Sequence, residues 1–325
     1  MKSAMTFCLL VLLALLGARR DAEAVQVSAP SYVRLVDWAK ANGFNSRWLK
    51  PEETILLSRN GSKLVMTVDS REAQINGVQV WLLLPVVARY RSLCVAQLDV
   101  DRTLRPLLSP PRAQSGTKIR TICLDPGHGG KDPGNEVGSN QEKHFTLLLA
   151  QEVRSELARA GIKATLTRTT DTFVDLPTRP ELAKRRGTDL FVSLHFNAAD
   201  AGRSTVQGAE VYCLTPVGAS STNARGEGAG AGWFTGNQYN DQNLFLAYQV
   251  QKSLTRNLAV ADRGVRRARF AVLRDAVMPA VLIEAGFMSN PAEGRKIFTS
   301  EYRQKMARAI VDGLLAYKRA VEQGA

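Results

Sequence analysis

The sequence predicts an α/β protein in which a small β-rich unit precedes a twisted, mostly parallel sheet flanked by helices. After residue 118, short apolar runs alternate with segments whose apolar residues recur at helical spacing. Parallel strands need long crossovers, usually helices, so this alternation is typical of a mostly parallel sheet. Before residue 108 the apolar runs are short and alternating, and Asn60-Gly61 and Asn76-Gly77 are strong hairpin-turn signals between them.

Residues 1–24 look like a secretory signal. Lys2 gives the charged start, residues 5–17 form a short apolar core, and Ala22-Glu23-Ala24 is a small-x-small cleavage pattern. We therefore expect export, to the periplasm or the cell wall, with a mature chain that begins near Val25. An uncleaved anchor is the alternative, although the apolar core is short for one. No other stretch is long and apolar enough to cross a membrane, so an integral membrane protein is not predicted.

The chain is strongly basic. It has 43 Lys and Arg residues against 30 Asp and Glu residues, a net charge of +13, and removal of residues 1–24 would take away three basic and two acidic residues and leave +12. In an exported protein this charge favours an anionic polymer or a membrane surface as partner, through long-range attraction. No nucleic-acid motif is present, so nucleic acid is not predicted as a partner. A solvated basic surface without a specific partner is the alternative.

Cysteine usage predicts no disulfide framework. After loss of the signal the chain keeps Cys94, Cys123 and Cys213, which is an odd number. Cys123 and Cys213 fall inside predicted strands, and we interpret them as small buried hydrophobic residues. A single disulfide is the alternative, because export usually leads to an oxidising compartment.

Residues 25–107 form the predicted first unit, and residues 108–117, rich in Pro, Ser and Gly, form a predicted linker. After an amphipathic helix over 31–43, strands are expected at 54–57, 63–68, 73–75 and 78–84. The unit has no histidine, and we expect it to act as a spacer or wall-docking module outside catalysis. The rhythm of its strands and the stretch INGVQVWLLLP resemble the amine-oxidase N-terminal-like modules of many exported bacterial proteins.

Residues 118–325 form the predicted second unit. Its expected strands lie at 119–124, 164–167, 190–194, 210–214, 270–273 and 281–283. Its expected helices lie at 145–160, 180–186, 243–258 and 301–321, and Asn243 is the expected N-cap of the third. Residues 216–242 interrupt this order with a long Gly-, Ser- and Asn-rich loop that contains Trp233. Loops of this length are usually functional or disordered, and the aromatic residues favour a substrate-facing role.

Two histidines follow two of the predicted strands. His128 lies in the glycine-rich stretch after 119–124, and His195 directly follows 190–194. Open α/β sheets place their ligands at the carboxyl ends of the strands, so we expect one shared metal site. A catalytic zinc needs three N or O ligands and an open position, and the third candidates are Glu142, Glu136, Asp132 and His144. The alternative is that both histidines are turn residues without a ligand role.

A metal-activated water also needs a general base, and Glu284 is the candidate. It ends the predicted apolar strand 281–283. A carboxylate that is buried without a partner is unfavourable, so a lone one at this place suggests a catalytic role. A salt bridge to one of the many arginines is the alternative.

Four ordered motifs in the second unit resemble a known family. They are LDPGHGGKDPG at 124–134, EK at 142–143, SLHFNA at 193–198 and MPAVLIEAGFMSN at 278–290. Together they resemble the zinc-dependent N-acetylmuramoyl-L-alanine amidases of the amidase 3 group, over residues 118–317. The resemblance implies a sheet of about six strands. It also implies hydrolysis of the amide between the muramic acid lactyl group and the L-alanine of the stem peptide, so peptidoglycan is the expected partner.

The resemblance also implies roles for individual residues. The zinc ligands carry over onto His128, Glu142 and His195, and the catalytic glutamate carries over onto Glu284. We add Asn197 and Trp233 as candidate substrate residues and interpret Arg179 as structural. Some family members insert a long helix that occludes the site, but residues 216–242 are too rich in Gly and Ser to favour one. The sequence does not identify an activating protein.

Two other functions are alternatives to this one. A zinc exopeptidase that acts on free peptides shares the α/β fold, and a metal-free wall-binding protein is the non-enzyme alternative. Residues 127–130 match neither a dinucleotide fingerprint nor a phosphate-binding loop, since Asp132 stands where the latter requires Ser or Thr. No Gly-x-Ser-x-Gly nucleophile elbow is present either.

Overall fold

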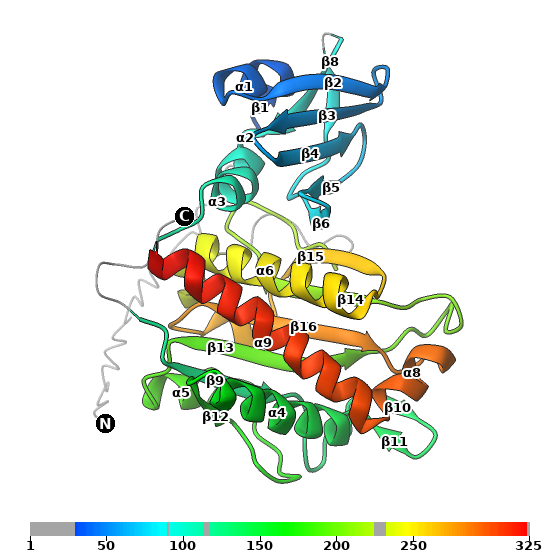
Figure 1. The fold of residues 1–325 in the computed structure, drawn as a ribbon, viewed down its shortest axis with the longest axis vertical. Coiled ribbons are helices and arrows are strands. Elements are labelled where there is room, and N and C mark those ends of the chain that lie inside the picture. Colours follow the sequence, from blue (N-terminus) through cyan, green and yellow to red (C-terminus); the bar gives the residue numbers. More distant parts are fainter. Residues whose placement is uncertain (1–29, 90, 113–117, 224–231, 324–325) are drawn as a thin grey trace, which may run out of the picture.

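The computed structural model describes residues 30–89, 91–112, 118–223 and 232–323. The predicted signal lies outside these ranges, as do half of the predicted linker and the middle of the long loop. Within the described residues, no helix combines the length and apolar character that crossing a membrane requires. The chain folds into two stacked units, of which the smaller is N-terminal (Figure 1).

The first unit is built on an antiparallel meander of strands β2 to β6. The strands are β2 (Asn45–Lys50), β3 (Thr54–Arg59), β4 (Ser62–Thr67), β5 (Glu72–Ile75) and β6 (Val78–Trp81). The predicted Asn60-Gly61 and Asn76-Gly77 turns join β3 to β4 and β5 to β6. All four turn residues have positive φ, as type I′ turns require. The predicted β-rich first unit is thereby confirmed.

The rest of the first unit differs from the prediction at both ends. Its remaining elements are β1 (Tyr32–Arg34), α1 (Leu35–Ala41), β7 (Val87–Arg89), β8 (Ser92–Ala96), α2 (Gln97–Asp99), η1 (Val100–Leu104) and α3 (Arg105–Leu108). The first helix begins four residues later than expected, because residues 32–34 pair with β8 instead. The helical segment 97–108 was not predicted. It is fixed by the buried carboxylate of Asp99, which accepts the backbone N–H groups of Leu83 and Leu84.

The second unit contributes six strands in the order β12-β9-β13-β16-β14-β15. They are β9 (Thr121–Pro126), β12 (Lys163–Leu166), β13 (Leu190–Asn197), β14 (Ala209–Leu214), β15 (Asp262–Ala268) and β16 (Ala280–Phe287). Every neighbouring pair is parallel except β14 with β16. Most of these strands are continuous apolar runs, as strands covered on both faces should be. The predicted mostly parallel sheet is confirmed.

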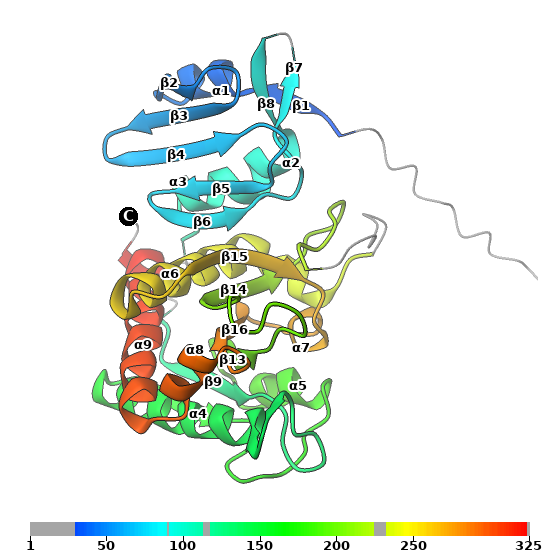
Figure 2. The same cartoon turned by 90° about the vertical axis from the view of Figure 1, so that its right-hand side faces the viewer.

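Helices cover both faces of this sheet (Figure 2). Three long helices pack on one face: α4 (Glu142–Arg159), α6 (Asn240–Leu258) and α9 (Ser300–Gln323). The other face carries the short helices α5 (Thr178–Arg185) and α7 (Ala271–Arg274), and α8 (Pro291–Ile297) follows the end of β16. His195 is the sixth residue of β13, and His128 lies in the loop that follows β9.

Two expectations for the second unit were wrong. Residues 271–274 form helix α7, and the strand lies earlier, at β15. Four of the seven residues in β15 are charged, so the strand lacks the apolar pattern from which strands were predicted. Asn243 lies inside α6, whose first residue is 240, and so it is not the N-cap. Its buried amide instead joins two elements, because it accepts the N–H of Ala280 and donates to the carbonyl of Gly236.

The two units share one sheet and one core, which the sequence did not predict. Strand β6 pairs with β15 at Val80 and Val265, and so the sheet continues through both units over 11 strands. The hydroxyl of Tyr248 on α6 donates to the carbonyl of Ile75 at 3.0 Å. A single cluster of buried apolar residues extends from Leu35 in the first unit to Val321 in the last helix. The smaller unit is therefore packed firmly onto the larger.

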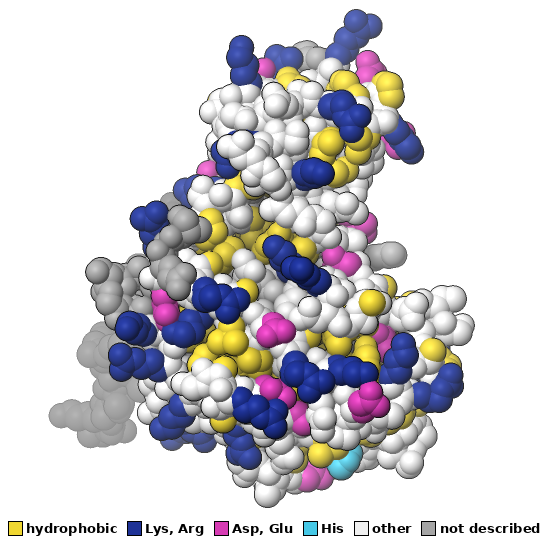
Figure 3. All heavy atoms as spheres, viewed as in Figure 1, with side chains coloured by type: hydrophobic (Ala, Val, Ile, Leu, Met, Phe, Trp, Pro, Cys, Tyr) yellow, Lys and Arg dark blue, Asp and Glu magenta, His cyan; other side chains and the backbone are white. Residues whose placement is uncertain are grey.

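The cysteines are buried, as expected for Cys123 and Cys213. Cys94, Cys123 and Cys213 are all buried and free, and burial raises the pKa of the Cys123 thiol to about 12. On the face in Figure 3, Lys and Arg side chains are spread over both units among Asp and Glu. On that face the net charge is therefore not gathered into one patch.

Candidate active site

The stretch Asp125–Gly130 turns out of the sheet at the carboxyl end of β9 and is held from below by two arginines. Arg179 is buried, forms an ion pair with Asp125 at 2.9 Å and donates to the carbonyl of His128 at 3.0 Å. Arg168 donates to the carbonyl of Gly127 at 2.8 Å. These bonds support His128 in the left-handed region, at φ 61°, a conformation that few residues other than glycine adopt. The predicted structural interpretation of Arg179 agrees with these contacts.

Two glycines let the side chains of the site approach one another. A Cβ atom at Gly127 would lie only 2.2 Å from Cε1 of His195. A Cβ atom at Gly134 would lie 2.6 Å from Cδ2 of His128 and 2.7 Å from Oε2 of Glu142. Any side chain at either position would displace the histidines or the glutamate. The glycine-rich sequence after β9 is therefore required by packing at the site as well as by the turn.

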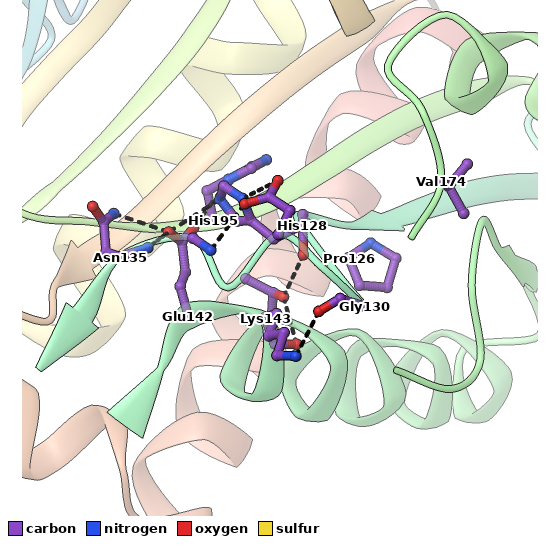
Figure 4. Close-up of polar contacts among 12 residues, drawn as sticks. Pro126, His128, Gly130, Asn135, Glu142, Lys143, Val174 and His195 are labelled. Atoms are coloured by element: carbon purple, nitrogen blue, oxygen red, sulfur yellow. Dashed lines mark hydrogen bonds and ion pairs between the residues drawn. The ribbon is translucent and has the colours of Figure 1, made fainter. Parts of the chain in front are cut away.

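Glu142 is the first residue of α4, and it points from the helix start toward both histidines (Figure 4). Its side chain is only 1% exposed. Oε2 accepts hydrogen bonds from the backbone N–H and the side-chain amide of Asn135, at 3.0 and 2.9 Å. Oε1 accepts the backbone N–H of Phe196 at 3.0 Å. These donors fix the carboxylate in one orientation, with an oxygen toward each imidazole.

The structure brings together three of the predicted metal ligands. Nε2 of His128 lies 3.1 Å from Oε2 of Glu142, and Nδ1 of His195 lies 3.0 Å from Oε1. One ligand atom from each residue lies within 4.8 Å of the others. Two imidazole nitrogens and one carboxylate are the donor set of several catalytic zinc sites. The residues present therefore fit a zinc ion.

The other three candidates for the third ligand lie outside this group. Glu136 is exposed in the short hairpin of β10 (Glu136–Val137) and β11 (Asn140–Gln141), where it accepts the side-chain amide of Gln141. His144 is exposed on α4, and because it is only two residues after Glu142 it lies on a different side of the helix. Oδ2 of Asp132 accepts a hydrogen bond from Nδ1 of His128 at 2.9 Å, whereas Nε2 of the same ring faces Glu142. A carboxylate in that place orients the imidazole and leaves Nε2 available to a metal.

The electrostatics of the metal-free group follow from this packing. Burial opposes ionisation of Glu142, but its hydrogen bonds and charge interactions with His128 and His195 prevail and hold its pKa well below the ordinary value. Burial likewise lowers the pKa of His128, but Glu142 and Asp132 outweigh this effect and raise it. The site thus concentrates negative charge around two histidines. Such a group favours a cation, either a proton or a metal ion.

Glu284 stands beside His195 on the neighbouring strand. The two residues are opposite each other in the parallel register of β13 and β16, so their side chains share one face of the sheet. Oε2 of Glu284 is buried and has no hydrogen-bond partner among the described residues. Burial, and then the negative charges of Glu142 and Glu210, raise its pKa well above the ordinary value. The predicted alternative, a salt bridge to an arginine, is not formed with any described residue.

This raised pKa predicts how the stability of the metal-free protein depends on pH. The unfolded chain ionises Glu284 near pH 4.5, whereas the folded chain retains the proton to higher pH. Its contribution to the free energy of unfolding therefore falls as pH rises above about 4.5 and until the folded pKa is passed. Glu284→Gln should raise the unfolding midpoint of chelated protein at pH 7 and change it little at pH 4. Calorimetry at both pH values measures this, and equal shifts at both would contradict the assignment.

A cleft of about 330 Å³ opens over these groups. Its lining includes polar side chains, those of both histidines, Glu142 and Glu284. It also includes an apolar wall formed by Leu176, Phe270, Val272 and Leu282. Leu176 is 53% exposed, so the wall extends to the surface. A substrate in this cleft would contact both the reactive groups and the apolar side chains.

The two predicted substrate residues do not line this cleft. The side-chain amide of Asn197 donates to Glu210 at 2.9 Å, and its oxygen accepts the N–H of Ala198. Trp233 is 63% exposed, in the described part of the loop after β14. That part contains only the short helix η2 (Thr235–Tyr239) before α6, and the rest of the loop lies outside the described residues. Substrate contact by either residue stays a prediction.

Sequence analysis missed several groups that shape the site. Asn135 lies between two of the matched motifs and fixes Glu142, but an Asn in a loop gives no signal of this. Asp132 was considered only as a ligand, although its spacing of four residues from His128 is compatible with a partner role. Leu176 and Phe270 come from segments that only the fold brings to the cleft.

A His-Glu-His group beside a glutamate with a buried, unpartnered oxygen, at the carboxyl edge of a mostly parallel sheet, is typical of metal-dependent hydrolases with an α/β fold. The chain belongs to the N-acetylmuramoyl-L-alanine amidase family, whose model matches residues 122–316. It is 36% identical over 250 residues to the N-acetylmuramoyl-L-alanine amidase AmiA of Escherichia coli, an alignment that covers 70% of this chain and 85% of the relative. The predicted family resemblance is confirmed.

Solved structures agree with this membership. The N-acetylmuramoyl-L-alanine amidase of Clostridium difficile 630 superposes with a TM-score of 0.52 at 33% identity, over 62% of this chain and 97% of that one. The CwlD amidase of Clostridioides difficile, solved in complex with the GerS lipoprotein, has a TM-score of 0.51 at 27% identity, over 61% and 98%. The chain is thus an amidase that hydrolyses peptidoglycan. The family match does not include the first unit, so its resemblance to amine-oxidase N-terminal-like modules gains no support.

Proposed function

We propose that the chain cleaves the amide between the lactyl group of N-acetylmuramic acid and the L-alanine of the stem peptide, with a zinc ion held by His128, Glu142 and His195. The observation that supports this most directly is the convergence of one atom from each of these residues within 4.8 Å. Family membership supports the identity of the bond that is cleaved. When bound, zinc polarises a carbonyl and lowers the pKa of water to ~7.

Glu284 performs the proton transfers in this proposal. Its unpaired Oε2 takes a proton from the attacking water while the water oxygen bonds to the lactyl carbonyl carbon. The same carboxyl then gives that proton to the L-alanine nitrogen as the C–N bond breaks. The remaining proton of the water ends on the amine, so the products are a lactyl carboxylate and a peptide with a free, protonated amino end. A raised pKa suits both steps, because it makes the carboxylate a stronger base and keeps the proton available for the amine.

The remaining residues hold the reactive groups and the substrate. Asp132 keeps Nε2 of His128 directed at the metal position, and Asn135 does the same for Glu142. The apolar wall around Leu176, Phe270 and Val272 suits the methyl groups that flank the scissile amide, one on the lactyl group and one on L-alanine. Burial of a methyl group contributes about 0.8 kcal/mol. This wall would therefore help to place the amide over Glu284.

Digestion of purified peptidoglycan tests the reaction. Mass spectrometry should find glycan strands with free lactyl carboxylates and stem peptides that begin with L-alanine. Free peptides of the same sequence should stay intact in a parallel digest. Release of single amino acids from free peptides would instead indicate the exopeptidase, and binding to peptidoglycan without any cleavage would indicate the wall-binding protein.

The cellular setting follows from the substrate. We propose that residues 1–24 direct export and that the mature enzyme acts in the periplasm or at the cell wall, where peptidoglycan lies. A protein partner for the catalytic domain is also part of this proposal, because the related CwlD was solved with a bound lipoprotein. N-terminal sequencing of exported protein should find a chain that begins near Val25.

A further inference from the structure

Glu210 is a second buried carboxylate next to the proposed base. It lies on β14 directly opposite Glu284 of β16, so the two side chains are neighbours on one face of the sheet. Only 2% of Glu210 is exposed. Unlike Glu284, it is fully partnered. It accepts hydrogen bonds from Asn197 and Tyr212, both at 2.9 Å, on Oε1, which leaves Oε2 for cationic groups.

Two arginines of β15 fill that second position. Nε of Arg266 lies 2.8 Å and Nε of Arg263 lies 3.1 Å from Oε2 of Glu210. Both guanidinium groups are partly buried, with 13% and 30% of their side chains exposed. Because Glu210 and Glu284 are cross-strand neighbours, an arginine released from Glu210 would be within reach of Glu284. Both arginines pair with Glu210, and Oε2 of Glu284 has no hydrogen-bond partner among the described residues.

Trp81 of the first unit holds both arginines in place. The Arg266 guanidinium stacks over the Trp81 ring, with its carbon 4.3 Å from the ring centroid. The indole N–H of Trp81 donates to the carbonyl of Arg263 at 3.1 Å. Gly264, between the two arginines, has φ +89°, and a Cβ atom there would lie 3.1 Å from Cδ1 of Trp81. A glycine at this position allows the indole to lie close against β15.

We propose that Trp81 is a positioning residue for catalysis: through Arg266, Arg263 and Glu210, the first unit keeps Glu284 free of an arginine partner. The inference rests on the proposed role of Glu284 as the base. It revises the expectation that the first unit takes no part in catalysis. The unit contributes no group to the cleft, but it fixes the charges that surround the reactive carboxylate.

Trp81→Ala should lower kcat for a small muropeptide by about 3- to 30-fold. This is the factor that corresponds to the free energy of a cation–π contact at a partly buried site. KM and zinc content should stay at the wild-type values, because neither the cleft nor the metal group is touched. Trp81→Phe keeps an aromatic face under Arg266 and should retain most of the activity. If Trp81 only stabilised the fold, Trp81→Ala and Trp81→Phe would not differ in kcat while KM and zinc content stayed the same.

Two further variants make the test specific. Tyr248→Phe removes the hydrogen bond to Ile75 but leaves the arginines untouched, so it is the matched control for a loosened junction between the units. In a Glu210→Gln background, Trp81→Ala should have no additional effect on kcat. Arg266→Lys, which keeps the charge and loses the stacked planar group, tests the same contact if Trp81→Ala does not fold.

Three outcomes would overturn the inference: wild-type kcat in folded Trp81→Ala, an equal loss of kcat in Tyr248→Phe, or additive effects of Trp81→Ala and Glu210→Gln. Wild-type enzyme is measured in the same assay. If the wild type does not cleave the muropeptide, the proposed reaction itself is wrong. If the wild type cleaves it and the variants match it, only the role of Trp81 is wrong.

Discussion

Replacement of Glu284 by Gln should lower kcat by about 10²-fold or more, the scale typical of losing an acid–base group, and leave the zinc content near that of wild type. The amide has almost the shape of the carboxylate but can neither take nor return a proton. Zinc should remain, because Glu284 is not one of the three converging residues. Steady-state kinetics on a muropeptide and metal analysis of the same samples provide the two readouts.

A nearby carboxylate provides the control for this substitution. Glu136 precedes the matched EK motif but points away on an exposed hairpin, so Glu136→Gln should keep both rate and zinc. If Glu284→Gln loses its zinc, Glu284 is a ligand, and the assignment of Glu142 as the third ligand has to be reconsidered. Retention of both zinc and rate would place the base elsewhere and refute the proposed mechanism.

Removal of the metal should abolish activity, and added zinc should restore it. In the proposed mechanism the metal would polarise the scissile carbonyl and acidify the water, and Glu284 alone is too weak a base to activate bulk water. Titration of the chelated protein with zinc should saturate at about one equivalent, as expected for a single His-Glu-His group. Full activity in a verified metal-free sample would refute the metal site.

Three substitutions, at Glu142, Asp132 and His144, should lower zinc affinity to different extents, according to how directly each residue contributes to the proposed metal site. Glu142→Gln removes a converging charge and should lower zinc affinity the most. Asp132→Asn disturbs only the orientation of His128 and should lower the affinity by roughly 10- to 100-fold, the range for partners of metal ligands. His144→Ala changes an exposed histidine on the same helix and should have no effect. A different order would contradict the assignment of the third ligand.

The sequence by itself determined the features that depend on neighbours in the chain. Asn60-Gly61 and Asn76-Gly77 predicted their hairpins because only certain residues accept positive φ in a two-residue turn. Continuous apolar runs predicted the central strands because strands covered on both faces need no polar side. His128 and His195 were identified because each follows such a run, and parallel strands end at one edge of the sheet.

Sequence spacing left open which residue joins His128 and His195, although the family resemblance implied Glu142, and the tertiary structure brings Glu142 to them. Glu142, Glu136, Asp132 and His144 lie within 13 residues of one another in the sequence, so spacing could not choose among them. The choice depends on where α4 begins and on how the preceding loop passes Gly134, which brings Glu142 against His128. Such positions arise from packing between segments, and no local pattern encodes them.

The role of β15 was also decided only by the tertiary structure. Its charged sequence carries no strand periodicity, because its arginines are satisfied by Glu210 and Trp81 instead of by water. These partners come from β14 and from the first unit, 56 and 185 positions away from Arg266. A buried charge is stable only beside its counterion, and folding brings the two together from distant parts of the chain. For that reason the site could be located from the sequence, whereas the charges that tune it could not.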